Sequence, residues 1–183
     1  MNKYEFTGET KFLFGRTLRQ IRAKISFGIV EVGEVGGWIE KEGNLSDDGD
    51  AWVYGDAQVS GNAQVFGDAQ VSGNAWVSGN AWVSGNAQVS GNAQVFGNAQ
   101  VCGDAQVSNQ SHFLCIGPIG SRYDFTTFFR TKNFEIYVKC GCFRGNIQKF
   151  AEKVSSTHGN SIYAKQYMAA IETAKACIDL TQE

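Results

Sequence analysis

Proline, histidine and long apolar runs are scarce in this sequence of 183 residues. Pro118 is the one proline, and His112 and His158 are the two histidines. No run of 18 apolar residues occurs, so the sequence predicts no transmembrane helix. The first residues, MNKYEFTGET, contain no apolar segment of the kind that a secretion signal requires. We therefore expect a cytosolic protein.

The cysteines are odd in number and irregularly spaced, which does not fit a disulfide framework. They are Cys102, Cys115, Cys140, Cys142 and Cys177. We expect all five to be reduced, in agreement with a cytosolic location.

Positive charge is absent from the middle of the chain. Residues 51–110 carry three aspartates and no lysine or arginine, whereas residues 111–183 carry nine basic and six acidic residues. The net charge of −2 gives no general attraction to duplex nucleic acid or to an anionic membrane. The C-terminal segment is therefore the better candidate for binding an anion, and an ordinary solvated surface is the alternative.

Residues 51–110 form ten hexads, of which the first nine have the pattern Ala-x-Val-x-Gly-Asn/Asp and the last, AQVSNQ, lacks the glycine. Side chains two residues apart in a strand point to the same side, so Ala and Val face inward while the residue between them faces outward. The glycine and its acidic or amide neighbour form the corner, because both tolerate left-handed backbone angles. Three hexads close a coil of about 18 residues in a parallel β-helix. Asn62, Asn80 and Asn98 should then form a ladder.

These hexads resemble those of the hexapeptide-transferase family, and the resemblance implies a left-handed parallel β-helix. Members that are acyltransferases usually form trimers and use a histidine as general base near a subunit boundary. They often carry a loop extruded between coils. Residues 51–110 contain no histidine and no interrupted hexad, so the sequence departs from the acyltransferase pattern.

The segment before the repeats is expected to close the column. Within residues 1–35, the run LRQIRAKISFG alternates apolar and polar positions, which predicts a half-buried strand that caps the first coil. Residues 36–50 contain two degenerate hexads, in which Ile39 and Leu45 occupy the Ala phase. We therefore divide the chain into an N-terminal β cap (1–35), a hexapeptide solenoid (36–110) and a C-terminal domain (111–183).

The C-terminal domain is predicted to be a β-β-β-α-α unit, which makes the whole fold mainly β. Its strands are Phe113–Ile119, Phe125–Arg130 and Glu135–Cys140. A loop at 141–145 precedes a helix over 147–157 capped by Asn146, and a final helix over 162–180 is capped by Ser161. A core of this size is marginal alone, so the domain should dock on the column or on a neighbouring protomer.

Two further stretches resemble segments of uncharacterised phage and prophage hexapeptide-repeat proteins. They are GGWIEKEGNLS before the repeats, and GSRYDFTTFFRTKNFEIYVKCGCFRG followed by THGNSIYAKQYMAAIE after them. The resemblance implies a phage origin and expression in the host cytosol. It implies no established activity.

Six aromatic residues stand out among the Gln and Ser of the outward positions: Trp52, Tyr54, Phe66, Trp76, Trp82 and Phe96. Phe66, Trp76, Trp82 and Phe96 are expected to lie around one corner of the column. A clustered aromatic patch on a column favours a subunit interface, so we expect a homo-oligomer packed through this corner, with a trimer favoured by the family resemblance. The alternative is that the C-terminal segment of the same chain covers these rings.

Signatures of catalysis and metal binding are weak. No Walker loop, GxGxxG or HExxH motif occurs. Cys140 and Cys142, with Cys115 or His158, would offer zinc ligands, but Cys-x-Cys is not the usual Cys-x2-Cys spacing. A nucleophilic cysteine with His112 or His158 as base would lack a third residue to orient it. We therefore expect no metal, no cofactor and no catalytic residue.

A binding site for a nucleotide-like anion is the remaining candidate. Arginines supply planar donors for phosphate, and tyrosine rings stack on a base. The candidate residues are Arg122, Arg130, Arg144, His158, Tyr123 and Tyr163, which would converge if the strand-end loops met at one rim. The alternative is that the arginines are exposed sheet residues and the aromatic side chains belong to the core.

These patterns favour a non-enzymatic phage binding protein with a counter-defence role. Its C-terminal domain would sequester a nucleotide-derived immune signal or block a host defence protein. Two alternatives stay open: a trimeric acyltransferase-like enzyme with His112 or His158 as base, and a purely structural oligomerisation module.

Overall fold

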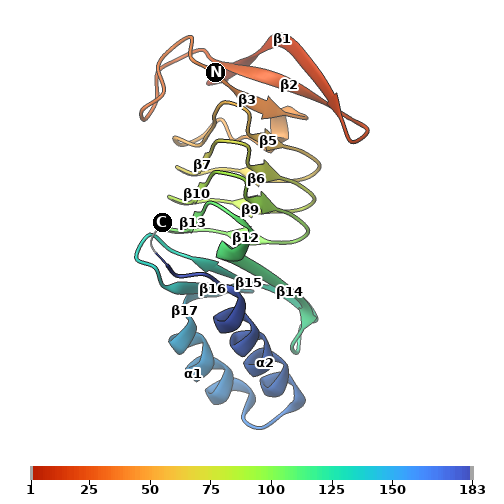
Figure 1. Cartoon of the computed structure of the whole chain (residues 1–183), viewed down its shortest axis with the longest axis vertical. Coiled ribbons are helices and arrows are strands. Elements are labelled where there is room, and N and C mark those ends of the chain that lie inside the picture. Colours follow the sequence, from red (N-terminus) through yellow and green to blue (C-terminus); the bar gives the residue numbers. More distant parts are fainter. Residues whose placement is uncertain (1, 182–183) are drawn as a thin grey trace.

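The computed structural model describes residues 2–181 as an elongated molecule with a β-solenoid between two capping units (Figure 1). Short 3-10 helices lie at Glu42–Asn44 and Gln110–His112. The strands before the repeats are β1 (Tyr4–Leu13), β2 (Arg16–Ala23) and β3 (Val35–Ile39). The repeat strands are β4 (Trp52–Val53), β5 (Gln58–Val59), β6 (Gln64–Val65), β7 (Gln70–Val71), β8 (Trp76–Val77), β9 (Trp82–Val83), β10 (Gln88–Val89), β11 (Gln94–Val95), β12 (Gln100–Val101) and β13 (Gln106–Val107). The C-terminal elements are β14 (Phe113–Ile119), β15 (Asp124–Arg130), β16 (Ile136–Cys140), β17 (Phe143–Asn146), α1 (Ile147–His158) and α2 (Ile162–Cys177).

Each hexad forms one side of a three-sided coil, as predicted. Strands 18 residues apart stack in parallel, so that Val59 lies on Val77 and Gln64 lies on Trp82. The alanines and valines of all ten hexads are buried, and they form one continuous core. Backbone hydrogen bonds such as Gln58 N to Ala75 O (2.9 Å) join each coil to the next. Small identical side chains therefore fill a narrow interior that depends on an unbroken register.

The corners require glycine for two reasons. Gly73 has φ of +66°, and a Cβ added there would lie 3.0 Å from the amide nitrogen of Gly91 in the next coil. The asparagines beside the corners form the predicted ladder: the side-chain amide of Asn62 donates to Asn80 (3.2 Å), and that of Asn80 donates to Asn98 (3.1 Å). The corner sequence thus provides both the turn and a lateral hydrogen-bond chain.

The phase predicted for Ile39 and Leu45 is wrong. Ile39 pairs with Val59 and Leu45 with Val65, so both side chains occupy the Val phase and lie 20 residues from their partners. In the predicted phase, Lys41 would point into the core, where an unpaired charge is costly. Two extra residues between Leu45 and Val53 shift the register and place the larger apolar side chains inside.

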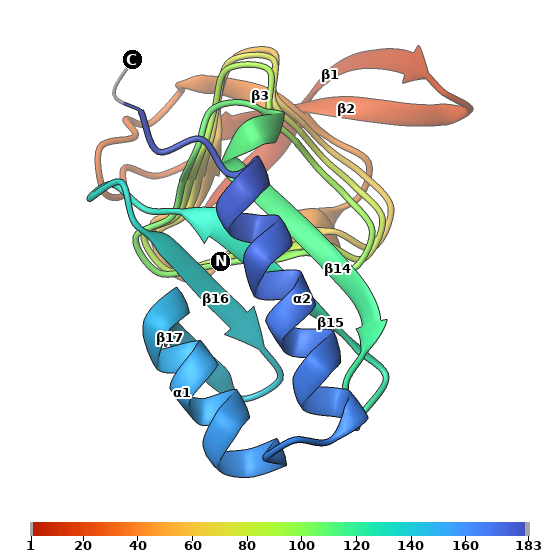
Figure 2. The same cartoon turned by 60° about the horizontal axis from the view of Figure 1, so that its bottom comes forward.

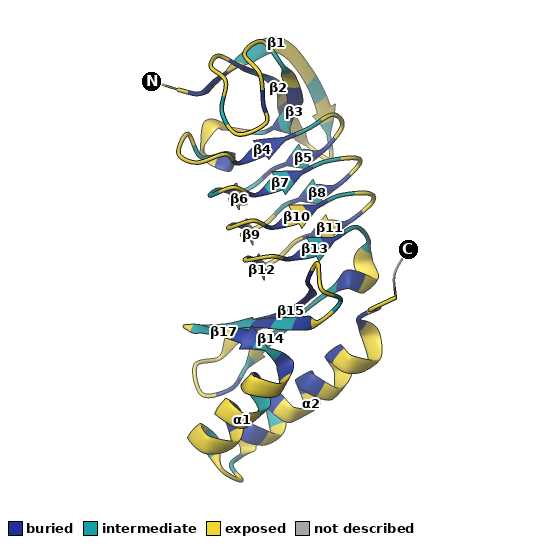
Figure 3. Cartoon of the chain, turned by 90° about the vertical axis from the view of Figure 1, so that its left-hand side faces the viewer, coloured by how far each residue is buried: buried dark blue, intermediate teal, exposed yellow. Residues whose placement is uncertain are grey.

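The N-terminal hairpin closes the first coil. Strand β2 pairs antiparallel with β3, so the sheet order β1-β2-β3-β5-β8-β11 continues one face of the solenoid into the cap. Tyr4, Ile21 and Trp52 are buried between the hairpin and the column. The hairpin thus covers the open edge of the first coil, as expected (Figure 3).

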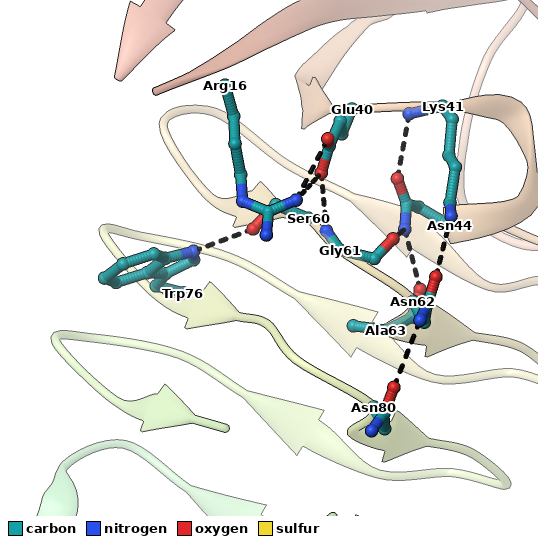
Figure 4. Close-up of polar contacts among 10 residues, drawn as sticks. All are labelled: Arg16, Glu40, Lys41, Asn44, Ser60, Gly61, Asn62, Ala63, Trp76 and Asn80. Atoms are coloured by element: carbon teal, nitrogen blue, oxygen red, sulfur yellow. Dashed lines mark hydrogen bonds and ion pairs between the residues drawn. The ribbon is translucent and has the colours of Figure 1, made fainter. Parts of the chain in front are cut away.

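A polar network also ties the hairpin to the column (Figure 4). Glu40 accepts hydrogen bonds from the Arg16 guanidinium (2.7 Å) and from the backbone N–H of Gly61 (2.6 Å). Burial tends to raise the pKa of Glu40, but these hydrogen bonds outweigh it and hold the pKa below its ordinary value. The carboxylate therefore stays ionised and links the tip of the hairpin to the second coil.

The C-terminal sheet lies across the other end of the column (Figures 2 and 3). Its order is β14-β15-β16-β17, with all neighbours antiparallel. Thr127 accepts a hydrogen bond from the backbone N–H of Gln100 (3.0 Å), and Phe129 joins the solenoid core. Phe128 and Val138 point to the opposite face, where α1 and α2 cover them. The sheet is thus shared between the two cores.

Strand β17 lies where the sequence predicted a loop. Cys140 pairs with Phe143 across a tight turn, and the Phe143 ring packs on Phe150 with ring centroids 5.1 Å apart. This tertiary contact holds the segment in an extended conformation, which the short sequence FRGN does not predict because glycine and asparagine are uncommon in strands.

Lys3 offers a test of the cap. Its side chain is buried, its ammonium donates to the carbonyls of Gly49 (3.1 Å) and Ala51 (2.8 Å), and it lies 4.7 Å from the centre of the Phe27 ring. Substitution Lys3→Met should leave two carbonyls unpaired and lower the free energy of unfolding by about 1–3 kcal/mol in urea titrations. The control Lys24→Met removes an exposed ammonium and should change the free energy by less than about 0.5 kcal/mol. Equal effects of the two substitutions would contradict the structural role of Lys3.

Candidate functional site: a cleft in the C-terminal domain

A cleft of about 330 Å³ opens in the C-terminal domain between the two helices and two loops of the sheet. The β14–β15 turn, the β16–β17 turn, one face of α1 and a tyrosine of α2 form its walls. The lining residues are Ser121, Arg122, Asp124, Cys140, Gly141, Cys142, Phe143, Phe150, Lys153, Val154, Thr157, His158 and Tyr167.

Aromatic rings form a continuous wall of the cleft. The Phe150 ring lies 5.1 Å from Phe143 and 5.6 Å from Tyr167, and Tyr167 lies 5.6 Å from the His158 imidazole. Phe150 and Tyr167 are almost fully buried, so their packing positions the wall rigidly. Phe143 and His158 are only half-buried, so their rings are the part of the wall that can contact the flat face of a ligand ring.

Charged groups surround this wall. Arg122 from the β14–β15 turn, and Lys153 and His158 from α1, are basic side chains that line the cleft. Asp124 is the acidic group of the lining, and its carboxylate already accepts a hydrogen bond from the backbone N–H of Phe125 (2.7 Å). The arrangement suits an anion with an apolar or aromatic portion, because the cations and the ring wall lie in one cleft.

Tyr167 remains a neutral phenol at physiological pH. Burial raises the pKa of Tyr167 to about 12, and the nearby Cys140 adds to the rise. Cys140 in turn accepts a hydrogen bond from the Thr126 hydroxyl (3.2 Å). The backbone N–H of Gly120 donates to Gln166 (2.8 Å), which fixes α2 to the β14–β15 turn. The tyrosine hydroxyl is thus a hydrogen-bonding group and not an anion in the cleft.

The structure brings two of the six predicted binding residues into the cleft lining: Arg122 and His158. Tyr163 lies near them, with its ring 6.1 Å from the His158 ring. Tyr123 is 71% exposed and lines a different groove, beside the solenoid. The strand-end loops therefore converge only in part.

Arg130 and Arg144 lie away from the cleft. Arg130 is at the opposite end of β15 from Arg122, is buried, and donates to the backbone carbonyls of Gln106 (3.4 Å) and Thr181 (3.1 Å). Arg144 is exposed on β17 and pairs with Lys139 across the strands. Arg130 thus has a structural role, in which it ties the end of the column to the C-terminal tail.

Sequence reasoning found His158 but missed the other helix residues of the cleft. Phe150, Lys153, Val154, Thr157 and His158 follow the spacing i, i+3, i+4, i+7, i+8, which places them on one face of α1. This periodicity was the available signal, but it is also that of an ordinary core face. Tyr167 carried no such signal, because only the packing of α2 brings it to the cleft.

The aromatic residues predicted at the corner do not form one patch. The Trp76 ring stacks on Phe14 of the N-terminal hairpin (5.2 Å), and its N–H donates to Ser60 (3.3 Å; Figure 4). Phe96 packs edge-on against Phe113 at 6.4 Å. Contacts within the chain therefore engage both rings.

Phe66 and Trp82 pack against each other instead. Their ring centroids are 6.1 Å apart, and Trp82 remains 45% exposed. Of the four predicted rings, Phe96 (57%) and Trp82 (45%) are the exposed ones, whereas Phe66 and Trp76 are half-buried.

Of the alternative catalytic groups, His112 and Cys102 are buried and Cys115 is half-buried, whereas His158 and Cys142 line the cleft. His112 is buried at the end of the column, and its Nδ1 accepts a hydrogen bond from the backbone N–H of Ser108 (3.1 Å). Burial raises the pKa of Cys102 and of Cys115, which keeps both thiols protonated. Within residues 2–181, no group of three or more His, Cys, Asp or Glu side chains is placed to hold a metal ion. No helix in this range is long and apolar enough to cross a membrane.

The comparison with protein families identifies the repeat. A family model described as the YdcK beta solenoid repeat matches residues 69–85 and 87–103. Both matches lie within the hexads, so the similarity concerns the column and not the C-terminal cleft. No curated protein matches the chain.

The raised pKa of Tyr167 predicts a pH dependence of stability. Its folded-state pKa of about 12 lies above the ordinary value of 10, so its contribution is complete below pH 10 and is lost as the pH rises toward 12. Urea unfolding at about pH 8 and about pH 11 should therefore show a larger loss of stability for the natural chain than for Tyr167→Phe. Equal losses of stability in the two proteins would show that burial does not raise the pKa of Tyr167.

Proposed function

We propose that this chain is a non-catalytic binding protein whose C-terminal cleft takes a small anion with a flat ring, of the nucleotide type. The observation that carries the proposal is an aromatic wall beside basic side chains in one cleft. In the wall, buried Phe150 and Tyr167 support the half-buried Phe143 ring, and the basic side chains are those of Arg122, Lys153 and His158. The solenoid would serve as a rigid support, because its backbone ladder continues directly into the contacts of the C-terminal sheet.

The cleft chemistry matches the parts of a nucleotide. The guanidinium of Arg122 and the ammonium of Lys153 would bind phosphate oxygens. A base would pack on the half-buried Phe143 and His158 rings of the wall. A volume of about 330 Å³ suits one nucleotide unit and not a long polymer.

The hydrogen bonds of Cys140 and the burial of His112 support binding without turnover. Cys140 accepts a hydrogen bond from a threonine, and no hydrogen bond joins a cysteine to His158 among residues 2–181. His112, the other possible base, lies buried beneath the C-terminal sheet. The acyltransferase-like alternative therefore rests on His158 alone, and acetyl-coenzyme A is the ligand that tests it.

The resemblance to phage hexapeptide-repeat proteins suggests the biological role that we propose for this binding. In the host cytosol, a cleft of this kind would sequester a nucleotide-derived immune signal as part of counter-defence. Blocking of a host defence protein is the other form, and it would use the same domain as a protein-binding surface.

A double substitution in the cleft, compared with a single control substitution outside it, tests the proposed site. Calorimetric titration of the full chain with mononucleotides and cyclic dinucleotides should detect binding to at least one of them. The double substitution Arg122→Gln and Lys153→Gln should weaken that binding about tenfold or more, because it removes two phosphate partners. Arg144→Gln removes an exposed arginine outside the lining and should leave the affinity unchanged.

Other outcomes of this titration would replace the proposal. An equal loss with Arg144→Gln would indicate general electrostatics and not a site. Release of a chemically altered nucleotide, or binding of acetyl-coenzyme A, would favour an enzyme. Binding of none of these ligands would leave the solenoid as a structural module or a protein-binding one.

Assembly into a homo-oligomer, with a trimer favoured, stays part of the proposal. It rests on the family resemblance and on Phe96, which is 57% exposed on the column. The mass of the purified chain in light scattering measures it directly, and the mass of a single chain would remove it.

A further inference from the structure

A second groove, which shares Asp124 with the C-terminal cleft, runs along one face of the solenoid to the C-terminal domain. It has a volume of about 510 Å³ and lies on the sheet of β6, β9 and β12 (Figure 3). Its floor is the outward row Gln64, Trp82 and Gln100, which stack in register on three successive coils. Tyr123 and its neighbour Asp124, from the β14–β15 turn, close one end.

The asparagine ladder forms one wall of the groove and keeps free hydrogen-bonding capacity. Each carboxamide offers two N–H donors and two acceptor lone pairs. In the ladder, Asn80 uses one donor toward Asn98 and one lone pair toward Asn62 (Figure 4). One donor and one acceptor of Asn80 therefore remain for a ligand. The Gln64 and Gln100 carboxamides of the floor add further groups of the same kind.

Aromatic faces complete the lining. The Trp82 ring is 45% exposed, and Phe66 packs edge-on against it at 6.1 Å, which holds its orientation. Tyr123 is 71% exposed and has a left-handed φ of +50°, so the turn directs it away from the domain core. A second hollow of about 380 Å³ shares Gln64 and Trp82 with the groove and extends it toward the first coil.

Charge decides the class of ligand. Among the described lining residues of the groove, Asp124 is the charged one, and no lysine or arginine is present. The Lys41 ammonium lies just outside the lining and already donates to Asn62 Oδ1 (2.9 Å), so a phosphate would find no lysine or arginine in the lining itself. An apolar helix would bury many carboxamides without hydrogen-bond partners, which is costly.

We infer that this groove binds a neutral oligosaccharide. The C–H face of a sugar ring packs on an indole, and its hydroxyl groups, which are both donors and acceptors, match carboxamides and a carboxylate. The floor spans two coil spacings of about 4.8 Å each, or roughly the length of a disaccharide. Trp82 is the stacking residue, the ladder and Gln64 bind hydroxyls, and Asp124 binds at the end next to Tyr123.

The repeat offers a matched pair of substitutions for the test. Residues 75–80 and 81–86 have the identical hexad AWVSGN. Trp82→Gln and Trp76→Gln each restore the glutamine that the coils above and below carry at that position, so both variants should fold. Trp76 lies on another face, stacked on Phe14, and serves as the control.

The experiment measures binding of the full chain to immobilised neutral di- to tetrasaccharides of glucose, galactose, mannose and N-acetylglucosamine, followed by titration with the best of them. We expect Trp82→Gln to raise the Kd about tenfold or more, and Trp76→Gln and Arg122→Gln to leave it unchanged. The Arg122 variant separates this groove from the C-terminal cleft, because it should weaken nucleotide binding only.

Three results would overturn the inference. The first is no binding of any member of the panel at up to about 10 mM. The second is equal affinity of the natural chain and Trp82→Gln. The third is a trimer in light scattering that Trp82→Gln converts to single chains, which would assign this face to a second copy.

Discussion

The register of the solenoid is the constraint on which the rest of the structure depends. An interior of alanine and valine has little area to bury per residue, so the hydrogen bonds between coils must contribute along the whole column. Val lies on Val and Ala on Ala only when each coil has the same length. A corner glycine that touches the next corner, as Gly73 touches Gly91, leaves no room for another side chain. The column is therefore rigid, and its outward positions are free to vary.

The open β-edges at the two ends of the column are covered in different ways. At the N-terminal end, two extra residues shift the first coil so that Ile39 and Leu45 fill the core, and the hairpin then pairs with the exposed strand. At the C-terminal end, a sheet lies across the column and donates Phe129 to its core. Each cap thus combines backbone pairing or hydrogen bonding with apolar burial, which is what an open β-edge requires.

The two clefts differ in the way that their chemistry arises. The C-terminal cleft gathers basic and aromatic side chains from a turn and two helices, so its shape depends on the packing of α1 and α2. The solenoid groove arises from repetition, because one outward position and one corner position recur on successive coils. A single change from Gln to Trp in such a row creates a stacking surface between amides. The proposed ligands differ accordingly, an anion in the first and a neutral sugar in the second.

Much of the fold was encoded locally and was predictable. The hexads specified the coil, the inward residues and the asparagine ladder, and β14 begins and ends where the alternation predicted. Asn146 and Ser161 cap α1 and α2 through their side chains, as their positions before the helices indicated. These features depend on residues close in sequence or on a strict period, which is why the amino-acid sequence alone determined them.

Tertiary structure decided the first coil, β17 and the composition of the cleft. The phase of Ile39 depends on a register shift that keeps Lys41 out of the core. The free-energy cost of burying the Lys41 charge is not visible in the local sequence pattern. Arg122 and Arg130 stand at opposite ends of one strand, so the first reaches the cleft and the second is buried against the column. Lys153 and Tyr167 reach the same cleft from two helices because both helices pack on one face of the sheet. Side chains far apart in the sequence meet only through such packing, so the members of a site were not predictable as the repeat was.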